Sequence, residues 1–445
     1  MSARLLYILR WFLELHRPPT YGSEAEIAAE VERNYRWNFT ANLLDVTLFW
    51  FGFSFISSTT VVPLYISKLS DSPLPLGIAA VIAQASWFLP QLLTANIVER
   101  LPRKKPVVVR VGFLLERLPI WLTVVSALVA VRSPGLALIL FLLGYAWRGL
   151  GAGFVATSWQ DLIARAFPTE RRGRFMGISL FSGTVVGTVA ALLSGRILDT
   201  FPFSTNFVYN FLFAASFVTL SWFFISQTRE PASPGRPPRR SNRQFVNELP
   251  GIMRQDANFR RFLLARVLIA FGALGTGFVT VSAVHRWGIP NSTVGTYTAA
   301  QLIGQAVATP GFGLLADRFG HKLTLEMGAL AAALAFTLAW LAPSQEWYFL
   351  VFALLGAMNG AIIVSGILIV MEFGPQDKRP TYAGLANTAV GVASVAAPLI
   401  GAALATTSYY LVFALSAGIT LVGLLLLHFR VREPRHVTRP LKIEA

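Results

Sequence analysis

The sequence predicts an all-α polytopic membrane protein, and three observations support this fold class. Hydrophobic residues make up 54% of the 445-residue chain and charged residues only 13%, against roughly 25% charged in ordinary soluble domains. The mean hydropathy of +0.56 means that the apolar side chains cannot all be buried in soluble cores. Apolar runs of the roughly 20 residues that a helix needs to cross a bilayer recur along almost the whole chain.

Twelve membrane-spanning helices can be placed on these runs, and proline and glycine mark most of the joins between them. The predicted spans are residues 42–66, 75–98, 106–131, 136–160, 174–198, 203–227, 259–285, 292–316, 322–342, 347–371, 380–406 and 409–430. A stretch rich in proline, arginine and polar residues separates the sixth span from the seventh and predicts a linker. The expected organisation is an N-terminal segment over 1–40, a six-helix bundle over 41–227, a linker over 228–258, a second six-helix bundle over 259–430 and a tail over 431–445.

The first residues, MSARLLYILRWFLELHR, predict an amphipathic helix on the membrane surface. They do not suit a signal peptide, because Arg10 and Glu14 interrupt the apolar stretch and no small-residue cleavage site follows.

The distribution of basic residues predicts the orientation of the chain. Most of the 38 lysines and arginines fall in the N-terminal segment, the even-numbered loops, the linker counted through Arg266, and the tail. Positive loops stay on the cytoplasmic side, so we expect both termini there, in a plasma (inner) membrane. The net charge of +16 then follows from topology and anionic lipid, and we expect no nucleic-acid partner.

The chain offers no residues for a bound metal or a thiol reaction. It has no cysteine, and its five histidines show no metal-ligand spacing. We therefore expect no cofactor and no metal. We also expect a monomer that binds a small-molecule substrate.

Two segments of the first half recur in the second half. ANIVERLPRKKPVVV follows span 2 and GLLADRFGHKLTLEM follows span 8, and each holds an acid–arginine pair, a short turn and a lysine. FPTERRGRFMG follows span 4 and GPQDKRPTYAG follows span 10, and in each a proline precedes an arginine and then a glycine at the same offsets. Equal offsets at both sites indicate two related, pseudo-symmetric six-helix halves.

These motifs resemble the major facilitator superfamily. The stretch Gly313–Lys322 is similar to the signature loop of that family, with its glycines, acid, arginine and basic residue in the expected places. The first-half copy departs from the pattern, because Asn96 and Pro102 stand where glycines are usual and Glu99 replaces an aspartate. The resemblance covers the chain from about residue 40 to residue 430. It implies two six-helix bundles around a cavity and says nothing specific about the substrate.

The resemblance also implies that the signature loop is a conformational gate. An acid and an arginine can pair across helix ends, and a modest surface ion pair suits a contact that must open and close. The alternative is that these residues only anchor the loop and fix the topology. The residues that we assign to gating are Gly313, Asp317, Arg318, Glu99, Arg100, Asp161, Arg172, Glu372 and Arg379.

Spans 5 and 11 carry small residues at four-residue spacing, which lets helix backbones approach closely in lipid. The ladders are Gly183, Gly187, Ala191 and Gly195, and Ala393, Ala397, Gly401 and Ala405. In the family these helices line the seam between the halves. A further family motif in span 5, typical of antiporters, requires a Gly-Pro pair, and this chain has Gly187-Thr188 instead.

Ionisable residues at bilayer depth are costly and usually functional. Glu116 and Arg117 lie within span 3 and Arg148 lies near the centre of span 4, so we expect a partner or a water-filled cavity beside Arg148, and Glu116 could be that partner. The resemblance implies that Arg148 faces the central cavity and takes part in proton coupling or binds an anionic group. The alternative is an ion pair that only fixes span 3 against span 4. Asp45 in span 1 is a weaker coupling candidate, because a solvated acid near a helix N-terminus costs little.

Polar residues in otherwise apolar spans extend the list of cavity candidates, although each could equally hold helices together. They are Gln84, Gln301, Gln305, Asn359 and Asn387.

The first hypothesis for function is secondary active transport by alternating access, with proton-coupled efflux of amphipathic small molecules ahead of uptake of a polar metabolite or nutrient. A transporter-like receptor that binds without transporting is the second class of hypothesis. An enzyme is not expected, because Glu116 and the two arginines are the only catalytic candidates at membrane depth.

Overall fold

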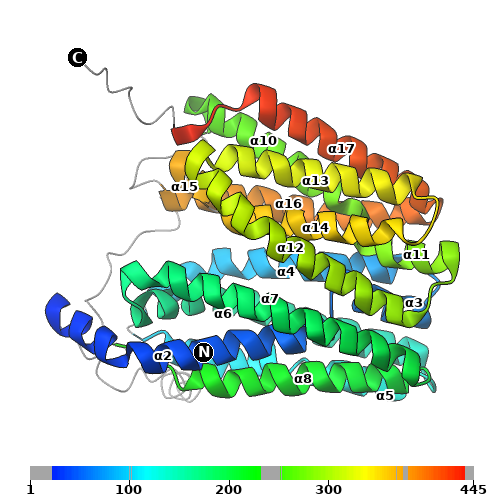
Figure 1. Cartoon of the computed structure of the whole chain (residues 1–445), viewed down its shortest axis with the longest axis horizontal. Helices are drawn as coiled ribbons and strands as arrows, with labels where there is room; N and C mark the ends of the chain where they lie inside the picture. The colour runs from blue at the N-terminus through cyan, green and yellow to red at the C-terminus, as the bar shows by residue number, and fades with distance from the viewer. Residues whose placement is uncertain are drawn as a thin grey trace, which may run out of the picture. The chain divides into compact units, whose positions relative to one another are not determined.

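The computed structural model describes residues 23–99, 101, 103–231, 251, 253–366, 368–373 and 379–435. No strand occurs among them. They belong to two compact units. The first unit consists of Met1–Ile56, Ser86–Ala190 and Thr200–Arg239, and the second consists of Ser57–Ala85, Ala191–Asp199 and Arg240–Ala445. Within each unit the helices run roughly parallel to one another, as Figure 1 shows. The predicted all-α architecture is therefore confirmed.

The helices follow the predicted spans in chain order. In the first half they are α2 (Glu24–Ser54), α3 (Val61–Leu69), α4 (Leu74–Glu99), the π-helical turns η1 (Val107–Val111) and η2 (Phe113–Arg117), α5 (Trp121–Val129), α6 (Pro134–Ala166), α7 (Thr169–Thr200) and α8 (Thr205–Ser226). In the second half they are α10 (Ala257–Gly272), the 3₁₀ helix η3 (Ala273–Phe278), α11 (Val279–Trp287), α12 (Asn291–Phe319), α13 (His321–Leu341), α14 (Trp347–Ser365), α15 (Leu368–Phe373), α16 (Arg379–Ala405) and α17 (Tyr409–Arg430).

Among the described residues, nine helices are long and apolar enough to cross a membrane, and Leu74–Trp87 is a shorter apolar helix. The predicted spans 42–66 and 292–316 are also helical, as α2 with α3 and as α12, but neither is among the nine. Threonine, glutamine and asparagine interrupt the apolar sequence of α12 and so lower its hydropathy. The count of twelve spans stays a prediction.

Helix α2 begins earlier than predicted. Ser23 and Glu26 form a capping box, in which the Glu26 carboxylate accepts from the Ser23 N–H at 2.8 Å and the Ser23 hydroxyl accepts from the Glu26 N–H at 3.4 Å. This cap starts the helix well before the predicted span 42–66. The amphipathic helix expected over the first seventeen residues lies outside the described residues.

Three spans are interrupted. Span 1 breaks between α2 and α3, span 7 passes through η3 between α10 and α11, and span 3 begins with the π-helical turns η1 and η2. Broken helices in transporters and π-helical turns in general occur frequently at functional sites. These interruptions direct attention to the side chains on η2 and on its neighbours.

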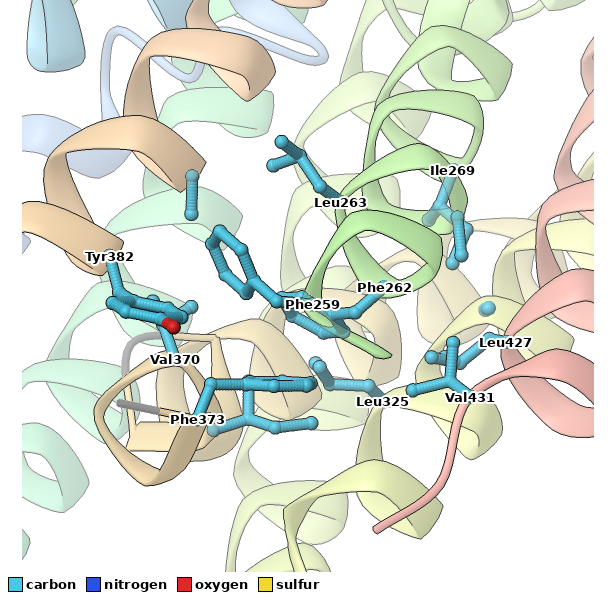
Figure 2. Packing of buried hydrophobic residues seen from close by; sticks show 14 residues of the cluster. Phe259, Phe262, Leu263, Ile269, Leu325, Val370, Phe373, Tyr382, Leu427 and Val431 are labelled. Carbon is cyan, nitrogen blue, oxygen red and sulfur yellow. The ribbon is translucent and has the colours of Figure 1, made fainter. Parts of the chain in front are cut away.

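An apolar core surrounds the first turns of α10 in the second unit, and Figure 2 shows it from close by. The Phe259 ring lies 5.3 Å from Phe373 and 4.5 Å from Tyr382, measured between ring centroids. The full cluster is Phe259, Phe262, Leu263, Ala265, Ile269, Leu325, Ala329, Ile369, Val370, Phe373, Tyr382, Ala386, Leu427 and Val431. It joins α10, α13, α15, α16 and α17 at one end of the second unit.

The first unit has an aromatic cluster at the corresponding place along α2. Phe39 lies 5.7 Å from Phe175, and Phe167 stacks on Phe175 at 4.2 Å, between ring centroids. Since a phenylalanine of the first helix of each half packs in an aromatic cluster in this way, the internal repeat seen in the sequence extends to packing.

Candidate functional site

Four charged side chains are buried together in the first unit. Asp45 on α2, Glu116 and Arg117 on η2, and Arg148 on α6 are 4%, 7%, 9% and 7% exposed. Glu116 forms an ion pair with Arg117. The Arg148 guanidinium lies 4.7 Å from the centroid of the Phe53 ring, a cation–π contact. We refer to Asp45, Glu116, Arg117 and Arg148 as the charge cluster.

The charge cluster contains polar atoms without hydrogen bonds. Among the described residues, Asp45 Oδ1, Arg117 Nε and Arg148 Nε have no hydrogen-bond partner. Leaving a buried polar group unpaired costs about 1–3 kcal/mol, and more for a charged one. Two carboxylates and two guanidinium groups balance in total charge. The charge cluster is therefore neutral as a whole, but some of its polar atoms lack partners. A site that gains and loses a proton or a ligand has this property.

The packing of α6 against η2 explains the two glycines that follow Arg148. A Cβ atom at Gly151 would overlap the carbonyl oxygen of Leu115 on η2, and one at Gly153 would overlap the carbonyl oxygen of Ser86 on α4. Only glycine permits such close backbone approach. The same approach brings the helix that carries Arg148 against the π-helical turn that carries Glu116 and Arg117.

Two sequence expectations about this cluster are wrong. Asp45 is not a solvated acid near a helix N-terminus, because α2 begins at Glu24 and buries the side chain. Glu116 pairs with its neighbour Arg117 and forms no ion pair with Arg148, which instead lies over aromatic rings. The sequence identified the four residues, and the structure brings them together with different partners.

The predicted gate residues of the signature loop lie at the end of α12. Asp317 and Arg318 are both exposed, and the Arg318 guanidinium lies 5.2 Å from the Phe319 ring centroid. A Cβ atom at Gly313 would meet nothing within 4 Å, so close packing does not explain that glycine. The turn itself requires Gly320, whose φ of +97° is accessible mainly to glycine.

The other gate candidates find partners within their own unit. Asp161 lies 3.4 Å from the Lys104 ammonium and 3.0 Å from the Arg165 guanidinium. Burial lowers the pKa of Lys104, and the neighbouring Asp161 opposes that shift. Arg172 donates from Nε to the Phe167 carbonyl at 3.1 Å.

Glu372 accepts from Arg435 Nε at 2.6 Å, and Arg435 also donates to the Ala316 carbonyl near the end of α12. Arg100 lies outside the described residues, and the side chains of Glu99 and Arg379 are not described.

Two of the polar candidates, Gln301 and Gln305, are buried on α12. The Thr59 hydroxyl donates to Gln301 Oε1 at 2.6 Å, so Gln301 joins the break in span 1 to α12. The remaining three, Gln84, Asn359 and Asn387, are partly buried on α4, α14 and α16. For Gln301 the structure favours a role in holding helices together.

The structure also shows a matched pair of contacts that the sequence analysis missed. Asn38 on α2 donates to the Arg229 carbonyl at 3.0 Å and accepts from the Arg229 N–H at 2.8 Å. Asn258 on α10 donates to the Arg432 carbonyl at 2.9 Å and accepts from the Arg432 N–H at 2.8 Å. Each asparagine thus holds the chain that leaves the last helix of its half against the first helix. We call each of these a terminal clamp.

The glutamate next to each clamped arginine caps another helix. Glu230 accepts from the backbone N–H groups of Lys104 and Lys105, and Glu433 accepts from that of Lys322. Burial raises the pKa of Glu230, while the two N–H groups oppose this shift. The third helix of each half is therefore tied to the end of the sixth.

A sequence signal for the terminal clamps exists. Arg-Glu-Pro occurs at 229–231 and again at 432–434, and Asn-Phe occurs at 38–39 and again at 258–259. A repeat search extended to the ends of the halves would find both. The structure shows why they recur, because the same backbone contact is made in each half.

The comparisons with known proteins agree with the internal repeat. The sequence model described as Major Facilitator Superfamily matches residues 116–286 and residues 262–445. Multidrug resistance protein 1 of Bacillus subtilis (strain 168) is 28% identical over 176 residues, which are 39% of this chain and 44% of that protein. Multidrug resistance protein MdtG of Citrobacter koseri (strain ATCC BAA-895 / CDC 4225-83 / SGSC4696) is 32% identical over 154 residues, 34% of this chain and 36% of that protein. These matches thus span less than half the length of either relative.

The fold is also found among solved structures. The crystal structure of a D-xylose-proton symporter matches with a TM-score of 0.67 and 16% sequence identity, over 90% of this chain and 99% of that one. At this identity the likeness is one of fold.

Proposed function

The chain belongs to the major facilitator superfamily, and on this premise we propose that it exports amphipathic small molecules in exchange for protons. Membership makes it a multi-pass membrane transporter rather than an enzyme. A transporter-like receptor that binds without transporting is the alternative that the flux assay below tests. The names of the two multidrug resistance relatives support efflux as the direction. The absence of a Gly-Pro pair at Gly187-Thr188 is the one departure from the antiporter pattern.

The observation that carries the coupling proposal is the charge cluster. The charge cluster has two acids, and of these only Asp45 forms no ion pair among the described residues. The Oδ1 atom of Asp45 also has no hydrogen-bond donor. A proton on Asp45 removes an unpaired buried charge, and its release restores the neutral sum of the cluster. Glu116 is paired with Arg117, so these two charges largely cancel and leave Asp45 and Arg148 as the charges whose balance can change.

Arg148 connects the protonation of Asp45 to substrate binding. Its guanidinium lies over aromatic rings and keeps an unpaired Nε. When Asp45 changes its protonation state, the balance of charge around Arg148 changes by one unit, which alters the cost of having a ligand beside it. In this mechanism protonation and substrate binding therefore influence each other through one buried site.

The gate completes the proposed cycle. Asp317 and Arg318 are exposed at the end of α12 and are free to make a transient ion pair, while Glu372 and Arg435 hold that helix end within its own unit. We further propose that both termini are cytoplasmic, that the protein lies in the plasma membrane, and that it works as a monomer.

Transport into proteoliposomes tests the proposal. The purified chain would be reconstituted, a pH gradient imposed, and uptake measured for ethidium, 8-anilinonaphthalene-1-sulfonate and xylose, with and without the protonophore that collapses the gradient. We expect accumulation of an amphipathic probe that depends on the gradient. Gradient-driven accumulation of xylose alone would favour uptake of a polar metabolite. Binding of a probe without any flux would contradict transport.

A further inference from the structure

Arg266 is a charged residue at membrane depth that the charge cluster does not include. It lies in the apolar segment Ala257–Trp287, more than two turns after the start of α10. At about 1.5 Å per residue it stands about 14 Å along the helix. An arginine at such a depth is costly and in most cases functional. The basic-residue count included it with the linker although the predicted span 259–285 contains it, and the structure places it within α10.

The face of α10 on which Arg266 lies is turned toward protein. Phe262, four residues earlier, and Ile269, three residues later, share that face and are 0% and 9% exposed. Both belong to the apolar cluster of Figure 2. Leu264, on the opposite side of the helix, is 54% exposed. Arg266 itself is partly exposed.

The positive charge of Arg266 is not neutralised within the part of the chain that the structure describes. No described residue forms an ion pair or hydrogen bond with its side chain. Another arginine of this unit is satisfied, since Arg286 donates to the Ala339 and Ala342 carbonyls. Because the charges of the charge cluster already balance one another, Arg266 adds an uncompensated positive charge.

We propose that Arg266 binds a negatively charged group of the transported molecule, so that the substrates are amphipathic organic anions. A guanidinium offers five N–H donors in a planar fork that fits a carboxylate, sulfonate or phosphate. This inference rests on the proposed function, and it adds that the transported molecule carries a negative charge.

Binding of two ions of equal shape and opposite charge tests the proposal. Tetraphenylborate and tetraphenylphosphonium would be titrated calorimetrically into the purified full chain in a non-ionic detergent. We expect tighter binding of the borate, and a weakening of that binding by about 10-fold to 100-fold in Arg266→Gln, because the borate accepts no hydrogen bond and the variant removes one Coulomb attraction in a partly buried place. Phosphonium binding should not weaken.

Two further variants distinguish binding at Arg266 from a general effect of removing a positive charge from the protein. Arg266→Lys keeps the charge without the fork and should retain part of the preference for the anion. Arg261→Gln removes the same charge from an exposed position on the same helix and should change nothing. Equal borate binding in wild type and Arg266→Gln, or a wild-type preference for the phosphonium, would overturn the proposal.

Added phosphatidylglycerol tests a lipid phosphate as the anion. Stabilisation by this lipid that requires Arg266, without any effect of tetraphenylborate, would also overturn the proposal. Gradient-driven export of ethidium, together with equal borate binding in wild type and Arg266→Gln, would leave proton-coupled efflux standing while this inference fell. No binding and no transport of any probe by wild type would count against both.

Discussion

The two terminal clamps make the same pair of hydrogen bonds to an arginine backbone in different surroundings, and Asn38 also donates to the Ala166 carbonyl at 3.4 Å. Comparing the two clamps therefore measures what burial adds, together with this one further bond. Asn38 is 1% exposed, whereas Asn258 is only partly buried. In Asn258→Ala, water can replace both lost bonds, so we expect a loss of about 1 kcal/mol. In Asn38→Ala, the N–H and C=O of Arg229 lose their partner where water has less access, so we expect about 3 kcal/mol.

Thermal unfolding of the purified variants in detergent measures this difference. Because the entropy of unfolding grows with chain length, 1 kcal/mol shifts the Tm of a 445-residue chain by about 1–2 °C, and Asn38→Ala should lower Tm by about 2–4 °C more than Asn258→Ala. Asn38→Asp is the control for shape. It replaces the Nδ2 donor with an oxygen that faces the Arg229 carbonyl, and it should cost at least as much as alanine. An equal or larger effect at Asn258 would refute the argument from burial.

Three further predictions concern single contacts. Burial raises the pKa of Glu230 above its ordinary value of 4.5, so the folded state binds this proton more tightly and the stability it contributes is lost as pH rises from about 4.5 through the folded pKa. Glu230→Gln should flatten the fall of Tm over that range, and an unchanged slope would contradict this. A Cβ atom at Gly356 would overlap the Gln301 carbonyl, so Gly356→Ala should cost about 1–3 kcal/mol or more, whereas Gly418→Ala, with nothing within 4 Å, should not lower Tm. Thr59→Val removes the donor to Gln301 and should lower stability by about 0.5–1.5 kcal/mol, measured by the same unfolding assay, and no change would show that this bond contributes nothing.

Composition and periodicity predicted the fold class because lipid imposes one solution on long apolar runs. Span boundaries were less predictable. The start of α2 depends on a capping box at Ser23 and Glu26 in a polar stretch that hydropathy does not register. The breaks in spans 1, 3 and 7 were also missed, since helix packing rather than local sequence decides them.

For the candidate site, the identity of the charged residues followed from their cost in lipid, but their partners did not. The pairing of Glu116 with Arg117 depends on the π-helical turn η2, which has no recognised sequence signal. Arg266 lay within the predicted span 259–285 but was counted with the basic linker, because a count of charges cannot tell the end of a loop from the interior of a helix. Asn38 and Asn258 were overlooked although their surroundings repeat in the sequence.

The most direct test of the account compares gradient-driven transport with exchange at equal pH in Asp45→Asn. Exchange of a labelled amphipathic probe across the proteoliposome membrane needs binding and alternating access but no proton movement, whereas accumulation against a gradient needs coupling. We predict that Asp45→Asn retains exchange and loses gradient-driven accumulation. The control is Glu32→Gln, which changes an exposed acid on the same helix and should behave as wild type in both assays. Gradient-driven accumulation that survives in Asp45→Asn would contradict the role given to the charge cluster.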